Sequence, residues 1–287
     1  KKKGQPEKGY SKEVKSSFIS ENFMLATANP IATKEGFKVL KNGGSAIDAV
    51  VAVQMVLNVV EPQSSGIGGG AFILYWDAKT KQLYSFDGRE RSPKALKKDY
   101  FLNDKGQKKK FWEMVQGGGS VGVPGTLRLM EFVHQRYGLM NWSQLFEPAI
   151  RLARDGFKIS PRLSDSIKSA QKRGLDRFSA TRAYFFDSNN RPKLTGSKLI
   201  NEPLAKTFGL IAEKGADAFY KGDIAKAIVS EVQGTDFNPG YLTLQDLASY
   251  EVKVREPICV PYRQYNVCGM GSPSSGGLTV GQILGIL

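Results

Sequence analysis

The longest apolar stretch of this 287-residue chain runs from residue 46 to residue 60. Its positions are apolar on nearly every side of a helix, with Asp48, Gln54 and Asn58 as polar exceptions. A helix that is apolar all round belongs at the centre of a fold, and Ser45 just before it is a preferred N-cap residue. Because the stretch is shorter than the roughly 20 residues of a membrane span, it predicts a buried helix.

A second helix is predicted just before this central one. Pro30 suits a first helical turn, Phe37 and Leu40 are spaced to give the helix an inner face, and Gly43 ends the pattern. The two helices are therefore expected to be consecutive in the chain and separated by a short turn.

The pattern changes to that of strands after the central helix. Residues 71–76 and 83–87 are rich in aromatic and apolar residues, and the polar segment 77–81 joins them. This arrangement predicts two paired strands on which the central helix packs.

The middle of the chain is predicted to be helical, because apolar residues there recur every three to four positions. The predicted helices span residues 126–137, 143–154, 203–213 and 223–232; Thr243 with Asp246 resembles the cap of a further short helix, and residues 252–254 and 262–267 are predicted strands. Helices inserted between early and late strands indicate a layered α+β or α/β domain.

Composition adds one unusual feature, a formal net charge of +14. The lysines are spread along the chain, with short runs at residues 1–3, 97–98 and 108–110. No zinc spacing, RNA-module signature or basic amphipathic helix accompanies them, so a solvated basic surface is favoured over nucleic-acid binding. Residues 1–20 are polar and lack the apolar core of a signal peptide, and are expected to form a flexible lead-in.

Cysteine and histidine are scarce. Cys259 and Cys268 lie on two predicted adjacent strands, but pairing depends on strand register and stays open. His134 is the one histidine, and no G-x-S-x-G sequence supplies the serine of a Ser-His-Asp hydrolase. His134 is therefore assigned a structural role, and most zinc-site options are removed.

Arg89 is the strongest functional candidate. It follows the predicted strand 83–87 and Gly88, and Pro93 lies shortly after it, which favours a fixed turn. A fixed arginine can fork onto a carboxylate. The glycine-rich segment 66–70 allows a second backbone to approach closely.

The same glycines superficially match a dinucleotide-binding fingerprint through Gly66, Gly68 and Ala71. That fingerprint needs a strand before it and a helix after it, so that the phosphate meets a helix N-terminus. Here the predicted order is helix and then strand, so close packing is favoured over nucleotide binding.

Six motifs together carry a resemblance to a known family. In chain order they are residues 41–49 (KNGGSAIDA), 61–72 (EPQSSGIGGGAF), 86–93 (FDGRERSP), 120–125 (SVGVPG), 217–222 (DAFYKG) and 273–277 (PSSGG). Their sequence and order resemble the large subunit of gamma-glutamyltranspeptidase, also called glutathione hydrolase. The resemblance spans residues 21–287, which are expected to form one large-subunit domain truncated before the processing site.

This resemblance implies an α+β fold with the four-layer αββα architecture of N-terminal-nucleophile hydrolases, of which this chain supplies the large-subunit part with a helical middle. It implies a precursor that cleaves itself and a small subunit whose new N-terminal threonine is the nucleophile. The α-amine of that threonine can act as the base. No catalytic residue, cofactor or metal is therefore expected in this chain, which alone is expected to be inactive.

The implied reaction is hydrolysis of glutathione and related γ-glutamyl compounds, or transfer of their γ-glutamyl group, through a γ-glutamyl-enzyme. The implied partners are the small subunit, the γ-glutamyl substrate and an amino-acid or peptide acceptor, with no nucleic acid and no membrane span in this chain. A periplasmic or secreted location is implied, with the signal peptide absent from this chain.

Among individual residues, Arg89 matches the family's arginine that binds the α-carboxylate of the γ-glutamyl group, and Arg91 is a weaker choice. Ser274, Ser275 and the glycine pair 276–277 could supply oxyanion donors. The family's own oxyanion groups lie in the small subunit, so this cluster is expected to be a turn that caps a helix beginning near Leu278.

Two alternatives stay open. One is a related amidase, such as a cephalosporin acylase or a poly-γ-glutamate depolymerase, although the arginine within residues 87–90 favours a γ-glutamyl substrate. The other is a non-enzymatic binding module, which the absence of a downstream processing segment would favour.

Overall fold

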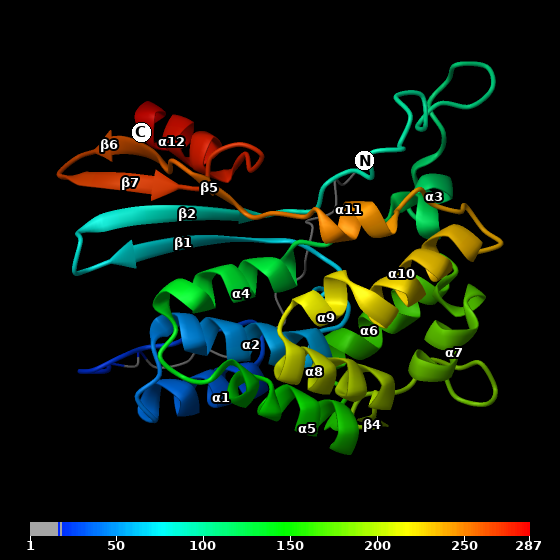
Figure 1. Ribbon diagram of the computed structural model, residues 1–287, viewed down its shortest axis with the longest axis horizontal. Coiled ribbons are helices and arrows are strands. Elements are labelled where there is room, and N and C mark those ends of the chain that lie inside the picture. The colour runs from blue at the N-terminus through cyan, green and yellow to red at the C-terminus, as the bar shows by residue number, and fades with distance from the viewer. Residues whose placement is uncertain (1–16, 18) are drawn as a thin grey trace.

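The computed structural model describes residue 17 and residues 19–287, so most of the predicted lead-in at residues 1–20 lies outside the described residues (Figure 1). In chain order the elements are α1 (Pro30–Lys41), α2 (Ala46–Val60), β1 (Ala71–Asp77), β2 (Gln82–Gly88), α3 (Phe111–Met114), η1 (Gly118–Ser120), α4 (Thr126–Tyr137), η2 (Trp142–Leu145), α5 (Glu147–Asp155), β3 (Phe157–Lys158), α6 (Pro161–Gln171), η3 (Leu175–Arg177), α7 (Ser179–Phe185), β4 (Lys198–Leu199), α8 (Glu202–Lys214), α9 (Asp217–Tyr220), α10 (Gly222–Gly234), α11 (Leu244–Ala248), β5 (Lys253–Arg255), β6 (Ile258–Tyr262), β7 (Tyr265–Gly269) and α12 (Gly276–Ile286). This mixture of helices and antiparallel sheets confirms the α+β class.

Helix α2 lies in the core, as its sequence predicts. Ser45 and Asp48 form a capping box: the Ser45 hydroxyl accepts a hydrogen bond from the Asp48 amide at 3.1 Å, and the Asp48 carboxylate accepts one from the Ser45 amide at 2.7 Å. The same carboxylate also accepts the amides of Leu139 and Met140, which joins the start of α2 to the end of α4.

The predicted inner face of α1 is wrong in one residue. Ala32 and Val39 are buried against α2, whereas the Phe37 side chain is 44% exposed and packs on Phe23, with ring centroids 5.3 Å apart. Gly36 decides the orientation of the helix, because a Cβ there would lie 2.5 Å from a methyl group of Val53. The face of α1 that carries Gly36 approaches α2 most closely, and Phe37 lies outside this face.

The predicted hairpin is confirmed. Strands β1 and β2 pair antiparallel from Ala71 opposite Gly88 to Asp77 opposite Gln82, and β5 pairs antiparallel with β2 on its other side. Helix α4 packs on β2, where Gly88 lies against Leu129. Figure 1 shows α4 and α2 on one side of this sheet and β6, β7 and α12 on the other.

The helical middle is also confirmed, with one interruption. The predicted helix 143–154 is divided into η2 and α5, because Pro148 lacks the amide hydrogen that a continuous helix requires and instead occupies the first turn of α5. In the described part of the chain, no helix is both long enough and apolar enough to cross a membrane.

The C-terminal region differs from its prediction. Residues 262–267 are not one strand, because the chain turns after Tyr262 at Arg263, whose φ is 54°, and continues as β7. Cys259 and Cys268 face each other across this hairpin and form a disulfide. Helix α12 packs on β6 and β7 through Gly281, which lies against Val260.

Candidate functional site

Arg89 follows the last residue of β2, on a backbone that is fixed by its neighbours. The Asp87 carboxylate accepts a hydrogen bond from the Arg89 amide at 2.9 Å and another from the Arg255 guanidinium of β5 at 2.7 Å. Asp87 is buried, so these charge-assisted bonds hold the strand end firmly. The predicted fixed turn is therefore present.

A second anchor comes from Tyr250, which is only 4% exposed. Its hydroxyl donates a hydrogen bond to the Arg89 carbonyl at 2.7 Å. Burial raises the pKa of Tyr250 to about 12, so the phenol stays protonated and remains a donor at neutral pH. A local anchor at Asp87 and a distant one at Tyr250 thus fix the backbone amide and carbonyl of Arg89.

Arg91 has a different role from Arg89. Its guanidinium lies over the Tyr250 ring, 5.0 Å from the centroid, and donates a hydrogen bond to the Glu251 carbonyl. Its backbone pairs with Val123 through two hydrogen bonds. Because these contacts engage Arg91 with the protein itself, Arg89 is the better placed of the two to bind a ligand.

The glycines of three motifs meet at this loop. A Cβ on Gly70 would lie 2.8 Å from the Glu90 amide nitrogen, and one on Gly125 would overlap the Gly88 carbonyl and the Tyr250 hydroxyl. The Gly69 carbonyl accepts the amides of both Gly125 and Thr126. The predicted close approach of backbones is confirmed, and α2 precedes these glycines while β1 follows them, the order that disfavours nucleotide binding.

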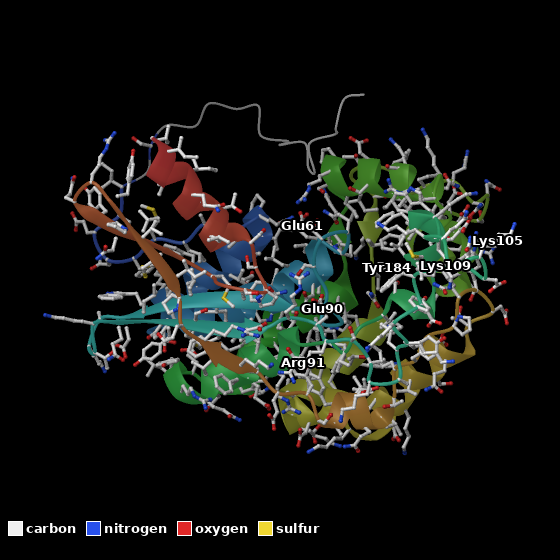
Figure 2. The ribbon with its side chains drawn as sticks, turned by 90° about the horizontal axis from the view of Figure 1, so that it is seen from above. Glu61, Glu90, Arg91, Lys105, Lys109 and Tyr184 are labelled. Carbon is white, nitrogen blue, oxygen red and sulfur yellow. A yellow bond between two sulfur atoms is a disulfide. The ribbon has the colours of Figure 1, made fainter. Side chains whose placement is uncertain are left out.

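Arg89 lines a cavity of about 840 Å³. One part of its lining is polar and includes Arg89, Glu90 and Ser120, and another is apolar and includes Phe101 and Phe111. Figure 2 places Glu90 and Arg91 near the middle of the molecule. In the described part of the chain no carboxylate pairs with the Arg89 guanidinium. The guanidinium carbon lies over the Phe72 ring, 5.9 Å from the ring centroid.

Two contacts of the 217–222 motif fix Pro124 and the start of α4. The buried Tyr220 hydroxyl donates to the Pro124 carbonyl at 2.9 Å and accepts the Arg128 amide at 3.2 Å. The Arg128 guanidinium forms an ion pair with Asp217 at 2.7 Å. The sequence marked the motif but assigned Tyr220 no role, and it offered no signal for Tyr250.

The cluster at residues 273–277 lies outside the lining of the Arg89 cavity. Ser275 is the N-cap residue of α12, the Ser274 hydroxyl accepts the Gly276 amide at 3.2 Å, and the Gly277 amide donates to Met270. The predicted turn precedes a helix, but α12 begins at Gly276 rather than near Leu278, and the Ser275 side chain makes no capping hydrogen bond.

His134 likewise has structural contacts. Its Nε2 lies 2.9 Å from the Met140 carbonyl and 3.5 Å from the Asp48 carboxylate, and its ring packs beside Trp142. Among residue 17 and residues 19–287, no three His, Cys, Asp or Glu side chains are grouped in a way that could hold a metal ion.

Comparisons with known proteins identify the family of the chain. The family model described as gamma-glutamyltranspeptidase matches residues 32–287. The chain is 43% identical to the glutathione hydrolase proenzyme of Bacillus subtilis, over 99% of this chain and 47% of that protein. It is similar to the crystal structure of Helicobacter pylori gamma-glutamyltranspeptidase, with a TM-score of 0.89 and 36% identity over 94% of this chain and 76% of that one.

A more distant likeness is to cephalosporin acylase from Bacillus halodurans, with a TM-score of 0.71 and 29% identity over 89% of this chain and 49% of that one. The chain spans about half the length of the B. subtilis proenzyme. The family model covers most of the chain, and the matched range includes Arg89 and the rest of the lining of its cavity. This chain therefore belongs to the gamma-glutamyltranspeptidase family, a family of enzymes.

Proposed function

We propose that the protein hydrolyses glutathione and related γ-glutamyl compounds, or transfers their γ-glutamyl group, and that Arg89 binds the α-carboxylate of that group. One observation carries this proposal: an arginine without a carboxylate partner in the described chain stands on a fixed loop at the edge of a cavity, in a member of this family. A guanidinium offers two parallel donors that match the two oxygens of a carboxylate.

The proposed chemistry is a two-step acyl transfer. A threonine hydroxyl attacks the γ-carbonyl carbon, the C–N bond of the amide breaks, and the leaving amine takes up the proton that the α-amine of the threonine has removed from the hydroxyl. Water, or the amine of an amino acid or peptide, then attacks the γ-glutamyl ester and releases the threonine.

The residues of this chain bind and orient the substrate in this scheme. The nucleophilic threonine is proposed to belong to a small subunit released from the same precursor by self-cleavage, so no catalytic residue is assigned here. Support comes from the word proenzyme in the names of the B. subtilis and Escherichia coli relatives, of which this chain matches 47% and 44%.

The small subunit is proposed to cover the sheet side that carries α12. This helix leaves Leu278, Val280, Ile283 and Ile286 between 47% and 86% exposed. Unpartnered apolar side chains on a helix are typical of an interface. Four layers follow one another in space: α12, the β6–β7 hairpin, the β1–β2–β5 sheet and α4. This order is compatible with part of a four-layer αββα sandwich, and residues 21–287 are proposed to form its large-subunit domain.

A periplasmic or secreted location is proposed on independent grounds. The Cys259–Cys268 disulfide is a feature that persists in oxidising compartments and is rare in reducing ones. The same compartments would expose the enzyme to extracellular γ-glutamyl compounds.

The test is to replace Arg89 by lysine in the full-length precursor. Lysine keeps the charge but loses the fork, so the KM for glutathione should rise roughly tenfold or more, since each ~1.4 kcal/mol is a factor of ten. Self-cleavage should be unchanged, because it needs no γ-glutamyl ligand, and two subunits should appear on a denaturing gel.

Arg136→Lys is the matched control, because Arg136 also lies over an aromatic ring, that of Phe132, and does not line the cavity. Its kinetic constants should equal those of the parent. Normal processing with parental kinetic constants for Arg89→Lys would eliminate the assignment of Arg89. Lack of γ-glutamyl turnover by the parent protein, with hydrolysis of another amide, would instead support a related amidase.

A further inference from the structure

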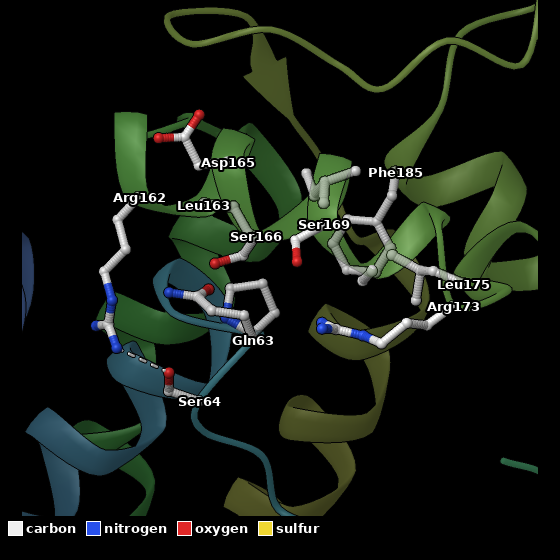
Figure 3. A pocket seen from close by; sticks show the side chains of 13 residues that line it. Gln63, Ser64, Arg162, Leu163, Asp165, Ser166, Ser169, Arg173, Leu175 and Phe185 are labelled. Atoms are coloured by element: carbon white, nitrogen blue, oxygen red, sulfur yellow. Dashed lines mark hydrogen bonds between the residues drawn. The ribbon is translucent and has the colours of Figure 1, made fainter. Parts of the chain in front are cut away.

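A second cavity of about 570 Å³ lies between α6 and the connection from α2 to β1 (Figure 3). It shares no lining residue with the cavity at Arg89. Nothing in the proposed γ-glutamyl chemistry uses it. Its lining combines serine hydroxyls and arginines with apolar side chains, which is the composition of a small-molecule site.

One wall of this second cavity is rigid and balanced in charge. The Glu61 carboxylate, 3% exposed, accepts hydrogen bonds from Asn29 at 2.7 Å, from Gln63 at 2.5 Å and from Arg162 at 3.0 Å. Arg162 also donates to the Ser64 hydroxyl at 3.1 Å. This wall therefore has a fixed shape, and Glu61 already neutralises the charge of Arg162.

The opposite wall carries Arg173, for which the described residues supply no carboxylate partner. Its guanidinium lies 5.0 Å from the ring centroid of Trp112, and Figure 3 shows it directed toward the cavity. Ser166 and Ser169 lie one helical turn apart on α6 with their hydroxyls on the cavity side. No described residue hydrogen-bonds to either hydroxyl, so one cation and two donors are available to an anion.

Most of the remaining lining is apolar, with Asp165, which forms an ion pair with Lys168 at 3.9 Å, as an acidic exception. Pro62, Leu175 and Phe185 contribute partly exposed surfaces between the two walls. A ligand that satisfies both parts needs an anionic group and an apolar body. The planar fork of an arginine fits either a carboxylate or a phosphate, but its single charge balances a carboxylate and not a doubly charged phosphate.

We propose that this cavity is a second ligand site, for a small carboxylate with an apolar body, and that Arg173 anchors the carboxylate. The site is connected to the Arg89 cavity through residues 111–116. Trp112 lies under Arg173, and the Gln116 side chain donates to the Arg173 carbonyl, while Phe111 and Met114 line the Arg89 cavity. The same short segment therefore lines the Arg89 cavity and contacts Arg173, which lines the second cavity.

The test measures the binding of 3-phenylpropionate to the full-length protein. Binding is detected by calorimetry and by tryptophan fluorescence. This probe has the carboxylate and the apolar body but no amine, so it cannot serve as an acyl acceptor. Saturable binding is expected, with affinity at least tenfold lower for Arg173→Gln. Trp112→Phe should remove most of the fluorescence change while calorimetric binding persists.

Two arginine variants are controls. Arg177→Gln removes the same charge from a residue that also stacks on an aromatic ring, Phe237 at 4.0 Å, but does not line the cavity. Arg89→Gln alters the other cavity. Both should bind the probe as the parent does, and the neutral 3-phenylpropanamide should bind at least tenfold more weakly than the acid.

The proposal fails if the parent shows no saturable binding at millimolar probe or if Arg173→Gln binds as tightly as the parent. It also fails if Arg89→Gln abolishes binding, since the probe then occupies the cavity at Arg89. Tighter binding of phenyl phosphate than of 3-phenylpropionate would contradict the carboxylate class. The binding test is independent of the proposed γ-glutamyl activity, so either can fail alone.

Discussion

The Arg89 loop and the turn at residues 273–277 both combine glycines with polar side chains, yet they are held in different ways. Partners far away in the sequence fix the Arg89 loop, among them Tyr250, which is 161 residues away. The turn is held mainly by its own residues, through the Ser274 hydroxyl and the amide of Gly276. Long-range anchoring fixes a side chain relative to a cavity, whereas local hydrogen bonds only begin a helix.

The largest expected effect is on the packing of the Arg89 loop. Gly125→Ala places a methyl group against the Gly88 carbonyl and the Tyr250 hydroxyl, neither of which can easily move. Overpacking of this kind typically costs about 1–3 kcal/mol and sometimes more, and we expect the upper end, together with a higher KM for γ-glutamyl substrates. The measurement is urea unfolding combined with steady-state kinetics.

Gly276→Ala is the matched change in the turn. A Cβ there would lie 3.4 Å from the Ser274 hydroxyl, an ordinary contact, so the free energy of unfolding should change by less than about 0.5 kcal/mol. Equal destabilisation by the two substitutions would remove the distinction between the two regions.

The next effect concerns the hairpin that precedes the turn. Replacing both Cys259 and Cys268 by serine opens a short loop, and the chain-entropy estimate gives a loss of about 2–3 kcal/mol. The loss should be visible in urea unfolding under non-reducing conditions and should vanish when the parent is reduced. Kinetic constants should stay near parental values, because the hairpin forms a sheet separate from the one that leads to Arg89. A large rise in KM would mean that the two regions are coupled.

A smaller effect than that of the disulfide is expected for the hydroxyl on Tyr250. Tyr250→Phe removes its hydrogen bond to the Arg89 carbonyl and should lower the free energy of unfolding by about 0.5–1.5 kcal/mol.

The same variant tests the titration of Tyr250. Its folded pKa, about 12, lies above the ordinary value of 10.0, so the folded protein holds this proton more tightly than the unfolded chain. The stability from this group is complete below pH 10 and is lost as the pH rises from 10 to 12. Tyr250→Phe should make that fall shallower, and Tyr184, whose pKa is also raised to about 12, should account for part of the remaining slope. Identical pH profiles for parent and variant would contradict the buried, protonated phenol.

Local signals in the sequence predicted much of the fold. The capping box at Ser45, the end of α4 at Gly138 and the β1–β2 hairpin are all specified by residues close together in the chain. The errors arose where tertiary contacts decide. Phe37 lies outside because Gly36 permits the closest approach to α2, and the β6–β7 turn has Arg263 at a positive φ, where glycine or asparagine would have signalled it.

The position of Arg89 on a fixed turn was predictable from the sequence, but the residues that support this turn were not. Arg89 could be singled out because a strand, a glycine and a proline surround it. Tyr220 and Tyr250 act through hydrogen bonds to backbone carbonyls that lie far away in sequence, at Pro124 and Arg89. A single sequence carries no periodicity or spacing that could reveal such contacts.

The most direct test of the central claim pairs a change in the enzyme with a change in the substrate. The kcat/KM of the full-length protein would be measured for γ-glutamyl-4-nitroanilide and for 4-aminobutyryl-4-nitroanilide, which lacks only the α-carboxylate, in the parent and in Arg89→Ala. A charge-assisted interaction of about 1.5–3 kcal/mol predicts that loss of the carboxylate lowers kcat/KM roughly 10- to 150-fold in the parent and far less in Arg89→Ala. The same ratio between the two substrates in both proteins would contradict the assignment of Arg89 as the carboxylate anchor.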